Sequence, residues 1–113
     1  MGDALPVPGE TVAAGDLRVT LLPFPFAVGE ATVEVSVEDG QGRPVAGASV
    51  AVVARMPDMG GTQTVAAEET GAGRYEARGV ALAMAGEWRL TVRVAPKGVA
   101  LTNAVYRVPV GDP

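Results

Sequence analysis

Cysteine and histidine are both absent from this sequence of 113 residues. Their absence removes disulfide bonds, thiolate nucleophiles, imidazole bases and the usual zinc ligands. The remaining carboxylates offer no clear replacement, because pairs such as Glu68 and Glu69 are adjacent and would point to opposite faces of a strand. We therefore expect a protein that is not an enzyme.

Positive charge is also scarce, with nine Lys and Arg against thirteen Asp and Glu and a net charge of −4 at pH 7. No stretch concentrates basic residues, so we expect no nucleic-acid partner. No run reaches the roughly 18 apolar residues of a membrane-spanning helix. The first 15 residues lack the charged-then-apolar order of a signal peptide. Export would therefore depend on a targeting segment outside this chain.

Aromatic residues make up only 4% of the sequence, whereas Ala and Val contribute 19 residues each. The core is therefore expected to be thin and aliphatic. Fifteen glycines and nine prolines predict many turns between short elements, which argues against a helical bundle. A chain of this length holds one core. We expect a single domain over residues 16–113, preceded by a flexible lead-in or linker over residues 1–15.

Alternation of apolar and polar residues predicts seven short strands. The clearest covers residues 32–38, where Val33, Val35 and Val37 share one face. The others are predicted at residues 17–23, 48–56, 62–68, 75–82, 87–94 and 101–110. The more polar strand over residues 62–68 is expected at a sheet edge. The predicted fold class is therefore all-β, an antiparallel β-sandwich of about seven strands.

Successive antiparallel strands place alternate connections at the same end of a sandwich. One end receives residues 39–47, 69–73 and 96–99, which are polar and glycine-rich and carry no evident chemistry. The other end receives residues 23–26, 56–60 and 83–86, and with them three of the four methionines and both phenylalanines. Chain order therefore allows Met56, Met59 and Met84 to lie close together.

Thioether sulfur is a neutral, polarizable donor that prefers Cu(I) to zinc, calcium or magnesium. Met56 and Met59 can direct two sulfurs to one side of their loop, Met84 can add a third, and Asp58 can lend charge nearby. The alternative is that these methionines fill gaps in the core. Met56 continues the inward face of its strand, and Met84 can plug the end of the sandwich against a phenylalanine.

Five short motifs follow one another in a fixed order. They are Phe-Ala-Val-Gly-Glu at residues 26–30, the segment from Asp-Gly to Gly-Arg-Pro-Val-Ala-Gly-Ala at residues 39–48, Met-Pro-Asp-Met at residues 56–59, Gly-Arg-Tyr at residues 73–75 and Met-Ala-Gly-Glu-Trp at residues 84–88. In this order they resemble the YtkA-like and FixH-like domains, over about residues 17–94. The resemblance implies an extracytoplasmic, immunoglobulin-like sandwich, often tethered to a membrane or part of a larger exported protein.

The resemblance also implies a role beside copper delivery, copper efflux or cytochrome oxidase assembly, in the periplasm or at the cell surface. The methionine motif of the family falls on Met56 and Met59, and its Met-x-Gly-x-Trp corner falls on Met84, Gly86 and Trp88. Relatives often carry a histidine just after the first motif, where this chain has glycine. A site here would therefore consist of thioethers alone. Gly86 and Trp88 also suit a turn and a core anchor.

Two functions remain open on these grounds. The first is an extracytoplasmic copper-handling binding module that holds Cu(I) weakly through Met56, Met59 and Met84. Its partner would be a copper-delivery or copper-efflux protein, or another subunit of an exported assembly. The second is a non-catalytic structural or protein-interaction module without metal. It would dock through the same end or through edge strands at residues 62–68 and 101–110.

Overall fold

The structure of the protein is a computed structural model that describes residues 5–22, 26–57, 62–98 and 101–111. Within these ranges the chain forms nine β-strands and no helix. The strands are β1 (Thr11–Ala14), β2 (Leu17–Leu22), β3 (Phe26–Ala27), β4 (Gly29–Asp39), β5 (Ser49–Arg55), β6 (Thr62–Gly71), β7 (Arg74–Leu82), β8 (Gly86–Ala95) and β9 (Thr102–Gly111). The all-β prediction is confirmed.

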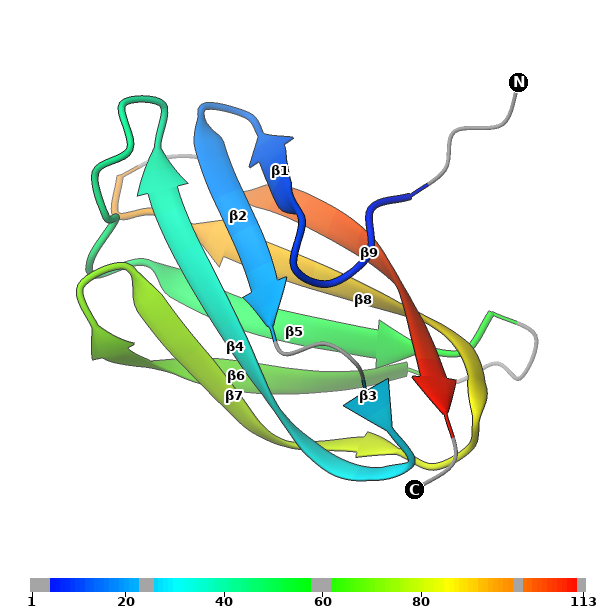
Figure 1. The fold of residues 1–113 in the computed structure, drawn as a ribbon. Coiled ribbons are helices and arrows are strands. Elements are labelled where there is room, and N and C mark those ends of the chain that lie inside the picture. The colour runs from blue at the N-terminus through cyan, green and yellow to red at the C-terminus, as the bar shows by residue number, and fades with distance from the viewer. Residues whose placement is uncertain (1–4, 23–25, 58–61, 99–100, 112–113) are drawn as a thin grey trace.

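The strands form two facing layers (Figure 1). One layer contains β1, β2, β4 and β7, and the other contains β5, β8, β9 and β3, in the continuous order β1-β2-β4-β7-β6-β5-β8-β9-β3. All pairs are antiparallel except β3 with β9. The seven predicted strands correspond to β2 and β4 to β9, with ends that differ by a few residues. The predicted sandwich is therefore confirmed.

Strand β6 connects the two layers. Its first part, Thr62–Ala67, pairs with β5, and its last part, Glu68–Gly71, pairs with β7. Where β6 and β7 diverge, the side chain of Gln63 accepts a hydrogen bond from the backbone N–H of Ala81 at 2.8 Å. Among the described strands, residues 62–67 have a partner on one side only, so this part of β6 is the edge of its layer, as predicted, although the strand continues into the other layer. Its side chains are polar because the strand runs around the corner of the sandwich, where none of them is fully buried.

The N-terminal segment differs from the linker predicted for residues 1–15. Residues 11–14 form β1, which pairs with β2. Before it, Gly9 N–H donates to Leu21 O and Arg107 N–H donates to Pro6 O, both at 2.8 Å. The segment is thus bonded to both layers. Its signal in the sequence is weak because a four-residue strand turns only two side chains inward.

Valines from both layers fill most of the core, including Val19, Val33, Val37, Val52, Val80, Val92, Val94 and Val108, all without exposed surface. Two buried tyrosines tie the core to the surrounding backbone. Tyr75 O–H donates to Val45 O at 2.7 Å, and Tyr106 O–H donates to Val19 O at 2.7 Å. Burial raises the pKa of Tyr106, so its hydroxyl remains a donor. Among the described residues, no helix has the length and apolar character needed to span a membrane.

Candidate metal site at the methionine end

The connections from β2 to β4, from β5 to β6 and from β7 to β8 lie at one end of the sandwich, as chain order predicts. We call this the methionine end, defined by described residues 56–57 and 83–86. Asp58 and Met59 lie outside the described residues, as does Phe24, one of the two phenylalanines that the sequence analysis assigned to this end. The structure therefore places two of the three predicted sulfur ligands, Met56 and Met84.

Met56 directly follows β5, is half-buried and packs against the core. Its methyl group occupies the space beside Gly86, since a Cβ atom built on Gly86 would lie 2.5 Å from Met56 Cε. Gly86 also has a φ of +138°, a region that side-chain-bearing residues rarely adopt. Glycine at this position therefore lets the residue after β5 contact the first residue of β8.

Met84 lies two residues before Gly86, and 46% of its surface is exposed. Its backbone carbonyl accepts a hydrogen bond from Trp88 Nε1 at 2.9 Å. Because Trp88 is buried, this bond anchors the turn over residues 84–88 to the core. The exposure of Met84 argues against this residue as a plug for the end of the sandwich. Met56, by contrast, packs against the core, as the gap-filling alternative predicts. The expectation that Trp88 is a core residue is confirmed.

At the methionine end, the half-buried thioether of Met56 lies next to Gly86, in the turn that carries the exposed thioether of Met84. Charge around them is mixed, because Arg55 precedes Met56 and Glu87 follows Gly86. In the described part of the chain, no group of three or more Asp, Glu, His and Cys side chains is placed to hold a metal. The donors that this end offers are soft sulfur atoms, which suit a soft monovalent ion.

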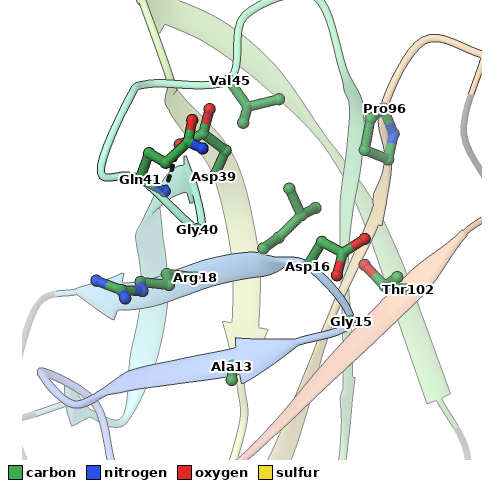
Figure 2. A pocket seen from close by; sticks show the side chains of 11 residues that line it. Ala13, Gly15, Asp16, Arg18, Asp39, Gly40, Gln41, Val45, Pro96 and Thr102 are labelled. Carbon is green, nitrogen blue, oxygen red and sulfur yellow. Dashed lines mark hydrogen bonds between the residues drawn. The ribbon is translucent and has the colours of Figure 1, made fainter.

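The opposite end of the sandwich holds a cleft of about 820 Å³ that the sequence analysis missed (Figure 2). Both layers contribute to its walls, including Leu17 from β2 and Thr102 from β9. Two glycines, Gly15 and Gly40, are among the residues that line the cleft. Their positions after β1 and β4 fit ordinary turns, so the sequence gives no clear signal of the cleft.

The carboxylate of Asp39, on the rim of this cleft, is bound within its own loop. Asp39 Oδ1 accepts hydrogen bonds from the backbone N–H groups of Arg43, at 3.0 Å, and Gln41, at 2.8 Å. These bonds lower the pKa of Asp39. The carboxylate therefore serves the turn after β4, and the cleft beside it is mainly apolar.

No curated protein matches the chain. The model of the YtkA-like family matches residues 11–93. The match begins at the first residue of β1 and includes Met56, Met84 and the contact at Gly86.

Proposed function

The chain belongs to the YtkA-like family, and on this premise we propose that it is an extracytoplasmic copper-handling binding module. It holds Cu(I) through methionine thioethers and exchanges the ion with a partner, either a copper-delivery or copper-efflux protein or another subunit of an exported assembly. It binds copper as cargo and catalyses no reaction. Its compartment is the periplasm or the cell surface.

The contact between Met56 and Gly86 is the observation that carries this proposal. Met56 and Met84 belong to different connections, and a Cβ on Gly86 would lie 2.5 Å from Met56 Cε. That contact brings one sulfur-bearing side chain beside the corner that carries the other. Met59 would supply the third sulfur by its position in the sequence, three residues after Met56.

The two described methionines differ in a way that suits exchange. Met56 is half-buried and fixed against the core, whereas Met84 is exposed and free to change rotamer. A fixed ligand retains the ion while an exposed ligand gives way to a donor from the partner. With thioethers alone, the site favours Cu(I) over Cu(II), which prefers nitrogen and oxygen ligands.

The test is titration of the metal-free protein with Cu(I) under anaerobic conditions against a competing chelator. Leucine replaces methionine with little change in volume or folding, so the variants are Met56→Leu, Met59→Leu, Met84→Leu and the triple variant. We expect the triple variant to bind at least about tenfold more weakly, which corresponds to about 1.4 kcal/mol. Equal affinity of the triple variant and the wild type would refute the copper proposal.

The packing of Met56 against the core favours a second candidate function. In this alternative the methionines are fillers and the protein is an interaction module without metal. Methionine methyl NMR signals distinguish the two. Selective shifts of Met56 and Met84 on adding Cu(I) support copper binding. Methyl signals that do not change on adding Cu(I) but shift on adding a metal-free partner protein support the interaction module.

A further inference from the structure

The outer face of β5, β8 and β9 carries a row of arginines. Arg55 lies opposite Arg89, and Arg89 lies opposite Arg107, so the three occupy one line across three neighbouring strands. All three point outward, because the residues next to them in each strand are buried. Arg93 lies on the same face of β8, four residues further along. We call this surface the arginine face.

Strands β5, β8 and β9 contribute one negative charge to this face. Glu87 is the only carboxylate in β5, β8 and β9, and its oxygens lie 3.7 Å from Arg89 and 4.0 Å from Arg107. The three strands therefore carry a net charge of +3 in a chain whose net charge is −4, which leaves −7 on the rest of the protein. Among the described residues, the outer surface of these three strands is therefore positively charged.

Among the described residues, these arginines have few carboxylate acceptors. Like charges directly opposite one another on neighbouring strands destabilise a sheet. Arg89 Nε is also shielded from solvent and has no hydrogen-bond partner among the described residues. Each guanidinium carries five N–H donors, whereas Glu87 serves two guanidiniums at the limit of ion-pair distance. Carboxylates from another molecule would supply the missing acceptors.

We infer that the arginine face docks a partner protein whose surface presents Asp or Glu side chains. Arginine forms paired hydrogen bonds with carboxylates through its planar fork, and all four cations on this face are arginines. Opposite residues on neighbouring strands have Cβ atoms about 5 Å apart. A partner with carboxylates at a similar spacing can therefore engage Arg55, Arg89 and Arg107 together.

The composition of the face favours a protein over a membrane or a nucleic acid. Val53, Thr91 and Val105 form the next row and are half-buried. An arginine-rich surface around apolar residues is typical of protein interfaces. The net charge of −4 opposes binding to extended polyanions, whose attraction depends on many phosphate contacts.

A second copy of this chain is a poorer occupant. Glu34, Glu76 and Glu68 do form one row on the outer face of the other layer. However, Glu76 is already paired with Arg78 at 2.7 Å. Two further arginines lie on this outer face, with Arg18 opposite Glu38 and Arg74 opposite Ser36. The two faces are therefore not simple opposites in charge.

The experiment uses the full chain without metal, so its outcome is independent of the copper proposal. The probe is a peptide in which Glu alternates with Thr, and the control peptide carries Gln in place of Glu. We expect the acidic peptide to shift backbone NMR signals of β5, β8 and β9, and the control peptide to shift none. Added salt should weaken the binding.

Variants then locate the surface. Arg55→Gln with Arg107→Gln should raise the Kd for the acidic peptide about tenfold, since two ion pairs with the peptide are lost. The matched control, Arg18→Gln with Arg74→Gln, removes the same charge from the other layer and should leave the Kd within about twofold. Arg55→Lys with Arg107→Lys keeps the charge, removes the planar fork and should give an intermediate Kd.

Three results would overturn the inference, provided that thermal unfolding shows every variant to be folded. The first is an equal loss of binding in both glutamine pairs, which would reflect overall charge. The second is tighter arginine-dependent binding to duplex DNA or to phosphatidylglycerol vesicles than to the acidic peptide. The third is self-association of the wild type that the Arg55→Gln, Arg107→Gln variant lacks, which would identify a second copy as the occupant.

Discussion

Replacing Gly86 with alanine tests the contact on which the candidate metal site depends. The substitution has two costs. Alanine at a φ of +138° strains the backbone by about 1–3 kcal/mol. The new Cβ, 2.5 Å from Met56 Cε, also forces the methionine into another rotamer, at about 0.5–1.5 kcal/mol. The free energy of unfolding should therefore fall by about 1.5–4.5 kcal/mol in total.

Gly29 provides a matched control for the backbone cost. Its φ is +131°, and no described heavy atom lies within 4 Å of a Cβ built there. Gly29→Ala should therefore cost only the backbone strain, about 0.5–1.5 kcal/mol less than Gly86→Ala. In a Met56→Ala background the methionine methyl group is absent, so Gly86→Ala and Gly29→Ala should lower the free energy of unfolding by the same amount.

The assay is urea unfolding followed by the fluorescence of Trp88, the single tryptophan of the sequence. Methionine methyl NMR provides the second readout, since Gly86→Ala should move the Met56 signal and Gly29→Ala should not. The reasoning fails if both substitutions cost the same in both backgrounds and the Met56 signal stays in place. In that case Met56 does not rest against Gly86, and the two methionine-bearing connections are not joined by this contact.

Three further predictions concern the framework around the site. Tyr106→Phe removes the hydroxyl that donates to a β2 carbonyl at 2.7 Å and should lower the free energy of unfolding in urea by about 1–2 kcal/mol; no change would mean that the bond contributes nothing. Gly73→Ala places a Cβ 2.8 Å from a β4 carbonyl oxygen at a φ of +74° and should cost more than about 3 kcal/mol. Gly47→Ala, at the same φ with no described atom nearby, should cost less, and equal shifts in thermal unfolding would contradict this. The lowered pKa of Asp39 means that its stabilisation is present above its ordinary pKa and is lost as the pH falls through the lowered value. In the Asp39→Asn variant, the urea concentration at the unfolding midpoint should therefore depend less on pH in the acid range. An unchanged pH dependence would show that the carboxylate does not contribute to stability.

Alternation of apolar and polar residues predicts most of the fold because the core is made of regularly spaced valines. Val33, Val35 and Val37 mark the buried face of β4 without ambiguity. Alternation does not predict β1 or β3, because β1 turns only Val12 and Ala14 inward and β3 has only two residues. Alternation also does not predict that β6 pairs with both β5 and β7. Alternation specifies which face a residue occupies, but not which strand lies beside it.

Chain order predicts that the connections carrying Met56 and Met84 share one end, and the structure places them there. The exposure of each side chain is not predictable in this way. Met56 is half-buried because Gly86 leaves room for it. Met84 is exposed, in a turn whose backbone is held by the hydrogen bond from Trp88 Nε1. The arginine face depends on the register between β5, β8 and β9, which periodicity within a single strand does not contain.

The double pairing of β6 affects how the protein comes apart. A sandwich with two separate sheets can lose one sheet edge while the other persists. Here β6 forms backbone hydrogen bonds with a strand of each layer. Unfolding of one layer therefore also breaks hydrogen bonds that belong to the other. The slowly exchanging amides of β4 and β8 should therefore exchange through one common unfolding event. A force that a partner applies to either layer would be transmitted to the whole domain.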